Sequence, residues 1–184
     1  MCKLPDKVQP KNKIQLEQLI GYAFKHNIYD LNFIDTSKIT NMSNLFANCE
    51  YDIDVSNWDV SNVTNMYNMF YCCKNFDCDL SNWNVSNVTD MYSMFIACEN
   101  FKGKGLENWD VSNVKDIGSM FAGCENFNCD LSNWDMSNVT DMGYAFIDCE
   151  KFKGKGLENW NVSNVTSMRR MFDGCNKLTI PDWY

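Results

Sequence analysis

The sequence predicts an α/β repeat solenoid: a right-handed stack of about six coils, each with a short parallel strand and a short helical turn, preceded by a capping helix. Two observations support this fold class. Tryptophan recurs about every 25 residues, at Trp58, Trp83, Trp109, Trp134, Trp160 and Trp183. Valine, methionine, phenylalanine and cysteine recur in register with it. Because so short a unit cannot bury its own apolar face, we expect equivalent positions of successive units to stack.

Each unit contains two spacings of apolar residues. The run from Val63 to Cys73 advances by steps of three, four and three residues between its apolar positions, which predicts a short helical segment. Phe76, Cys78 and Leu80 alternate with polar residues, which predicts a short strand. Parallel pairing of such strands would place neighbouring coils about 4.8 Å apart.

The two ends of the chain differ from the repeats. Residues 1–30 are expected to form an N-terminal tail and the capping helix, because the apolar side chains between Ile14 and Phe24 fall largely on one stripe. Residues 31–177 hold the solenoid of six coils. Residues 178–184, which include Pro181, are expected to form a C-terminal cap strand that covers the last coil.

The charge and hydropathy of the chain restrict its partners. With 24 acidic and 16 basic residues, the net charge of −8 disfavours direct binding of nucleic acid and favours a basic or neutral protein partner. No stretch has the length and apolarity of a secretory signal or a membrane span, so we expect a cytoplasmic protein that does not bind membranes. The identity of the partner and the oligomeric state are not encoded in recognisable motifs.

Cysteine and tryptophan form the predicted structural ladder. A single Cys per coil forms a line of thiols, whereas zinc needs four ligands that converge on one point. We therefore expect these thiols to fill the core, with zinc binding or disulfide formation as the alternatives. The ladder residues are Cys49, Cys73, Cys98, Cys124, Cys149 and Cys175, together with Trp58, Trp83, Trp109, Trp134 and Trp160.

The predicted strands also carry a charged stripe. In a parallel arrangement, acidic positions of one coil lie beside lysines of the next, and such cross-strand pairs contribute about 0.2 to 1 kcal/mol each. The same stripe is our candidate partner-binding surface, which comprises Asp77, Asp79, Lys102, Lys104, Asn128, Asp130, Lys153 and Lys155. The runs that begin at Asp52 and Asp77 are also similar to the opening of a calcium loop, although they lack its central Gly and its closing Glu.

Catalytic, metal and cofactor signals are weak in this sequence. His26 is the single histidine and falls at the end of the predicted capping helix. The Lys102–Gly105 segment lacks the Ser or Thr of a phosphate-binding loop. Candidate carboxylates all belong to repeated positions, which favours a structural role. We expect no enzyme activity, no metal site and no cofactor.

The motif Asp-Val-Ser-Asn-Val-Thr-Asp-Met-x-x-Met-Phe-x-x-Cys, of which residues 84–98 are one copy with Asn84 at the first position, resembles the repeat of the BspA-like leucine-rich repeat surface proteins, including the repeat region of Mycoplasma lipoproteins. The resemblance covers about Leu31 to Trp183. It implies a leucine-rich-repeat-like fold and a role in adhesion or protein binding, without implying any particular activity.

These observations lead to one leading hypothesis and two alternatives. The leading hypothesis is a non-enzymatic protein–protein interaction module that presents a rigid repeat surface, such as an intracellular adaptor, an effector, or a phage or viral inhibitor of a host protein. One alternative is an acidic decoy that imitates nucleic acid, whose binding should weaken steeply as salt rises. The other is a surface adhesin whose export signal is absent from this sequence.

Overall fold

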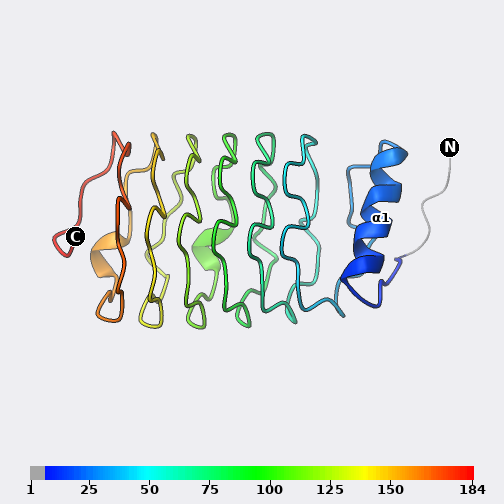
Figure 1. The fold of residues 1–184 in the computed structure, drawn as a ribbon, viewed down its shortest axis with the longest axis horizontal. Helices are drawn as coiled ribbons and strands as arrows, with labels where there is room; N and C mark the ends of the chain where they lie inside the picture. Colours follow the sequence, from blue (N-terminus) through cyan, green and yellow to red (C-terminus); the bar gives the residue numbers. More distant parts are fainter. Residues whose placement is uncertain (1–6) are drawn as a thin grey trace.

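The chain forms an elongated row of successive turns that lie side by side along its long axis (Figure 1). The computed structural model describes residues 7–184, so residues 1–6 of the predicted N-terminal tail lie outside the described part. The helix α1 stands at one end of the row, and the C-terminus lies at the other end. We number the repeats 1 to 6, and they comprise residues 36–60, 61–85, 86–111, 112–136, 137–162 and 163–184, while residues 31–35 lead into repeat 1.

Helix α1 spans Lys13–Lys25, over the segment expected to form a capping helix. Its first turn is capped because the Asn12 side chain accepts a hydrogen bond from the Gln15 amide at 3.0 Å. Leu16, Ile20 and Ala23 face inward and are buried in the common core. No helix among residues 7–184 is long and apolar enough to cross a lipid bilayer.

The predicted α/β solenoid of leucine-rich-repeat type, with parallel strands and helical turns, is wrong. The described residues are 11% helical and 6% in bridges, and they form no sheet. Besides α1, the helical elements are the short 3₁₀ segments η1 (Leu106–Asn108) and η2 (Leu157–Asn159). Seven isolated parallel bridges take the place of a sheet, and residues 178–184 contain no strand.

The expected strands fail for a reason visible in their hydrogen bonds. The Asp77 side chain, rather than a backbone carbonyl, accepts the hydrogen bond from the Lys102 amide at 3.0 Å. Asn128 accepts in the same way from the Lys153 amide at 3.1 Å. Side chains of Asp and Asn compete with the ladder partners of a strand. Gly103 has a φ of 86°, which also interrupts extended backbone.

The expected helical segments are instead runs of tight turns. In repeat 2, the amides of Met66, Asn68, Phe70 and Cys72 all donate to carbonyls of repeat 3. The amides between them close local turns, as from Met69 to the Met66 carbonyl at 3.1 Å. An α-helix directs every amide along its own axis, so it cannot share alternate amides with a neighbour. Asn68 has a φ of 53°, a left-handed conformation that lets the chain turn in this way.

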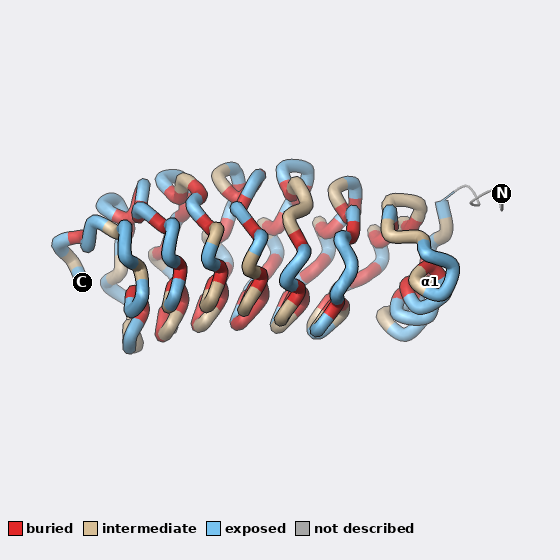
Figure 2. The backbone as a smooth tube through the Cα atoms, turned by 90° about the horizontal axis from the view of Figure 1, so that it is seen from above, coloured by how far each residue is buried: buried red, intermediate tan, exposed pale blue. Residues whose placement is uncertain are grey.

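Apolar columns fill the space inside the turns. Phe46, Phe70, Phe95, Phe121, Phe146 and Phe172 stack with centroids 5.4 to 5.8 Å apart. Buried residues line the inside of each turn, and exposed residues alternate with them on the outside (Figure 2). The core therefore extends from α1 through every repeat.

Each tryptophan bonds to a carbonyl in the turn that precedes it in the row. The indole of Trp58 donates to the Leu31 carbonyl at 3.0 Å, and that of Trp134 donates to the Leu106 carbonyl at 2.8 Å. The equivalent bonds recur up to Trp183, which donates to the Leu157 carbonyl at 2.7 Å. The five rings from Trp58 to Trp160 are buried and Trp183 is half-buried, and each has its polar atom satisfied, as a Trp in a core requires.

Candidate functional site

The predicted partner-binding residues share one side of the turns, on which the lysines and Asn128 are exposed and the three aspartates are half-buried. We call this side the charged face, and it comprises residues 77, 79, 102, 104, 128, 130, 153 and 155. Three of its four lysines form ion pairs with carboxylates of the preceding repeat. Lys104 pairs with Asp79 at 2.6 Å, and Lys155 pairs with Asp130 at 2.5 Å. Lys102 pairs with Asp77. Opposite charges therefore meet between repeats 2 and 3 and between repeats 5 and 4.

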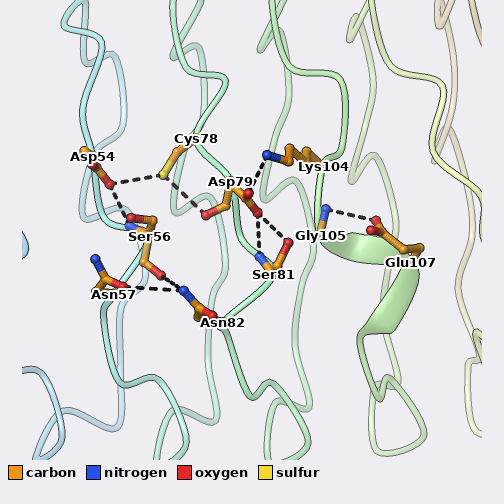
Figure 3. A network of polar contacts seen from close by, with 10 residues as sticks. All are labelled: Asp54, Ser56, Asn57, Cys78, Asp79, Ser81, Asn82, Lys104, Gly105 and Glu107. Carbon is orange, nitrogen blue, oxygen red and sulfur yellow. Dashed lines mark hydrogen bonds and ion pairs between the residues drawn. The ribbon is translucent and has the colours of Figure 1, made fainter.

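The carboxylates of Asp79 and Asp130 also accept hydrogen bonds from a serine two residues later. Asp79 accepts hydrogen bonds from the Ser81 amide at 3.0 Å and from the Ser81 hydroxyl at 2.5 Å, while Lys104 approaches its other oxygen (Figure 3). The hydrogen bond from Lys104, with those from Ser81, lowers the pKa of Asp79 to about 2. The Asp79 carboxylate is therefore ionised at neutral pH, and its two oxygens are occupied by Ser81 and Lys104.

The two halves of the charged face differ in one residue. Asp77 and Asn128 occupy equivalent positions, and each accepts a hydrogen bond from the amide of the following lysine. Asn128 does this without a charge, so Lys153 has no carboxylate where Lys102 has Asp77. Within residues 7–184, Lys153 forms no ion pair.

An open groove of about 420 Å³ lies over this second half. It contains three residues of the charged face, and it adds three that the sequence analysis did not select. Its lining consists of Lys102, Asn126, Asn128, Lys151, Lys153 and Lys177. Lys151 donates a hydrogen bond to Asn126 at 2.5 Å, and in the described part of the chain neither Lys151 nor Lys177 forms an ion pair. In a chain of net charge −8, the groove is a local concentration of positive charge.

The cysteine column lies inside the core. The thiol of Cys124 donates to the Phe95 carbonyl at 2.9 Å, and that of Cys149 donates to the Phe121 carbonyl at 3.0 Å. Burial raises the pKa of both thiols well above its ordinary value. All nine cysteines of the described residues are free. A buried, protonated thiol is a poor nucleophile and a poor metal ligand, so the column provides packing.

The run that begins at Asp52, which is similar to the opening of a calcium loop, stabilises a local turn. Asp54 accepts a hydrogen bond from the Ser56 amide at 2.9 Å, which closes a turn. Across residues 7–184, no group of three or more His, Cys, Asp or Glu side chains is arranged to hold a metal ion. His26 contacts the Tyr22 carbonyl through Nδ1 at 2.8 Å, at the end of α1 and far in sequence from the charged face.

Comparison with known proteins identifies the repeat. The family described as "Mycoplasma protein of unknown function, DUF285" matches residues 14–105 and again residues 93–183. The chain belongs to this family. No curated protein and no solved structure shows a significant match to it. The double match confirms that this DUF285 chain is a repeat protein of Mycoplasma type.

The DUF285 repeats also carry an acidic column that sequence reasoning did not select. Asp90, Asp116 and Asp141 are joined by isolated parallel bridges between successive repeats. Each accepts a hydrogen bond from the amide two residues later, as Asp116 does from Gly118 at 2.7 Å. Burial raises the pKa of Asp116, and the neighbouring carboxylates of Asp141 and Asp90 raise it further. The signal in the sequence is the recurrence of Asp after Val-Thr or Val-Lys.

Proposed function

We propose that this DUF285 protein is a non-enzymatic protein–protein interaction module, used as an adaptor, an effector or an inhibitor of a host protein, and that its charged face contacts the partner. The observation that supports this proposal is the groove of about 420 Å³, because three of the eight residues of the charged face line it. Concave sites with a few converging polar groups are the usual places where ligands bind.

Rigidity of the face adds to this support. In the Asp79–Lys104 and Asp130–Lys155 ion pairs, each charged side chain is already restricted by its partner before anything binds. These side chains therefore lose less rotamer freedom when a partner protein binds. Ordering a free lysine in an interface costs about 0.5 to 1.5 kcal/mol. A surface whose charged side chains are already held by one another avoids part of that cost.

The repeat motif supports the same kind of role. We propose that the DUF285 repeat is related to that of the BspA-like surface proteins, because residues 84–98 carry their motif from Asn84 to Cys98. That relationship implies protein binding or adhesion, and it does not specify a partner.

The test is affinity capture from the source organism or its host, with the captured protein purified and its affinity measured. The double variant Asp79→Lys with Asp130→Lys should keep the fold and lose the partner. A matched control is Asp110→Lys with Asp135→Lys, since these exposed residues cap the same kind of turn with Ser112 and Ser137 but form no ion pair within residues 7–184. Equal loss in both variants, or retained affinity in the first, would reject the charged face as the binding surface.

A second candidate function is the acidic decoy, and the Asp90, Asp116 and Asp141 column favours it, because three carboxylates repeat at regular spacing. Binding through that column should decline steeply with salt, since ions screen the attraction between the column and an approaching basic protein beyond about 8 Å at physiological ionic strength. Asp90→Asn with Asp141→Asn should then abolish binding, whereas the lysine variants of the charged face should not.

A further inference from the structure

We propose that the groove over repeats 3 to 6 receives an acidic segment of a partner protein, an extended stretch whose Asp or Glu carboxylates meet Lys151, Lys153 and Lys177. This inference rests on the proposed function and names the chemistry of the partner at the same face. The three lysines line the groove and form no ion pair within residues 7–184.

Comparison of the two halves of the charged face supports the inference. In the first half, Asp77 and Asp79 neutralise Lys102 and Lys104. In the second half, Asp130 neutralises Lys155, but Asn128 stands where Asp77 would. The amide oxygen of Asn128 accepts a hydrogen bond from the backbone amide of Lys153, as the Asp77 carboxylate does from that of Lys102. Only the charge is lost, so the difference leaves Lys153 available to an external anion.

The residues other than lysine that line this groove, Asn126 and Asn128, are neutral. Asn126 uses its amide nitrogen to bind the Glu99 carbonyl at 2.7 Å and its oxygen to hold Lys151. The side-chain nitrogen of Asn128 donates to no group among the described residues, so it is a further donor at the floor of the groove. Lysine ammoniums and amide donors together suit a carboxylate, which accepts up to about four hydrogen bonds.

The dimensions of the groove suit a short extended peptide. Its lysines lie on repeats 3, 5 and 6, so Lys102 and Lys177 are separated by three repeat steps. At about 4.8 Å per step this is roughly 14 Å, the length of about four extended residues. Alternate side chains of such a peptide share one face. Two or three carboxylates at every second residue would therefore meet the lysines.

The charge of the whole chain argues for a peptide rather than a nucleic acid. A polyanion that extends beyond the groove would meet a molecule of net charge −8. A segment with two or three carboxylates experiences mainly the local lysines, because the Debye length is about 8 Å at physiological ionic strength.

The sharpest test exchanges the residue types at the equivalent positions 77 and 128, so that Asn128 becomes Asp and Asp77 becomes Asn. Fluorescence anisotropy would measure binding of a labelled peptide of about eight residues in which Glu alternates with Ser, with Gln replacing Glu in the control peptide. Asn128→Asp should weaken binding of the Glu peptide about threefold, and Asp77→Asn should strengthen it by a similar factor, because exposed ion pairs are worth up to about a factor of five. Neither change removes the acceptor of the lysine amide.

Two control variants separate local from general charge effects. Asn84→Asp adds the same charge at a position where other repeats carry Asp59 and Asp110, so it should leave affinity unchanged. The triple variant Lys151→Gln, Lys153→Gln and Lys177→Gln should weaken binding about tenfold. Equal weakening by Asn84→Asp, absence of binding by the wild-type protein at low salt, or tighter binding of a single-stranded oligonucleotide of equal charge would each overturn the inference.

The outcome also distinguishes this inference from the proposed function. In one outcome, the Glu peptide fails to bind the wild-type protein while the Asp79→Lys with Asp130→Lys variant still fails to bind the captured partner. In that case the proposal of an acidic segment is wrong, and the charged face remains the interaction surface. If the captured partner binds that double variant as tightly as the wild-type protein, the proposed function is wrong as well.

Discussion

Replacing Gly105 by alanine should destabilise the protein strongly, because Gly105 lets one repeat approach the backbone of the repeat before it. Its φ is 96°, in the left-handed region that side chains disfavour. A Cβ built at this position would lie 2.6 Å from the carbonyl carbon of Leu80 and closer still to the amide nitrogen of Ser81. Both contacts are with backbone, which cannot rotate away.

The magnitude follows from two contributions. The left-handed conformation costs a non-glycine residue about 1 to 3 kcal/mol. Inserting a carbon into a filled space costs about 1 to 3 kcal/mol more, because the two repeats must separate. That separation would also lengthen the bond from the Leu80 amide to the Lys104 carbonyl, now 3.1 Å. We expect the free energy of unfolding to fall by about 2 to 6 kcal/mol.

Urea denaturation followed by circular dichroism would measure this loss. Gly21→Ala provides the control, since Gly21 lies in α1 and a Cβ there meets no atom within 4 Å. That variant should gain up to about 1 kcal/mol through helix propensity. A loss below about 1 kcal/mol for Gly105→Ala would show that the repeats are not packed at this distance, and it would refute the reasoning.

Three further predictions concern the titration of Asp116 and Asp79 and the accessibility of the Cys124 thiol. The pKa of Asp116 is raised, so the ionised form destabilises the fold above that pKa, and Asp116→Asn should raise the melting temperature at pH 7 but not below about pH 4. The pKa of Asp79 is lowered to about 2, so its stabilising effect is present above about pH 4 and is lost as pH falls toward 2. Melting temperatures of the wild-type protein should therefore fall more steeply over that range than those of Asp79→Asn, and parallel curves would contradict this. Cys124 should react with a thiol reagent only at the rate of global unfolding, because it is buried and its pKa is raised. Labelling of Cys124 as fast as that of Cys72 would show that the core is open to the reagent.

The sequence allowed the buried positions to be predicted, but not the backbone that buries them. Met66, Phe70 and Cys73 are all buried, as the step of three and four residues indicates. The same spacing arises from a run of tight turns in which alternate amides bind the next repeat. The deciding residues are left-handed, such as Cys72 with a φ of 57°. Cysteine carries no sequence signal for that conformation, so the spacing alone predicts a short helical segment, and that prediction is wrong.

The charged face was partly visible in the sequence. The alternation of Asp79 with Lys104 predicts a pair between repeats, and they lie 2.6 Å apart. The groove was missed because Lys151 and Lys177 lie outside the predicted strands, at positions occupied by Asn126 in repeat 4. The exchange of Asp for Asn128 is a signal that comparison of the two halves could have found. Its meaning depends on which side chains share a face, which requires the structure.

Nuclear magnetic resonance mapping would test the central claim most directly. The amide spectrum of the labelled protein, recorded with and without its captured partner, reports which surface is covered. The account predicts the largest shifts at Lys102, Asn128 and Lys153, on the charged face. Shifts centred instead on Asp90 and Asp141, with the charged face unaffected, would contradict it.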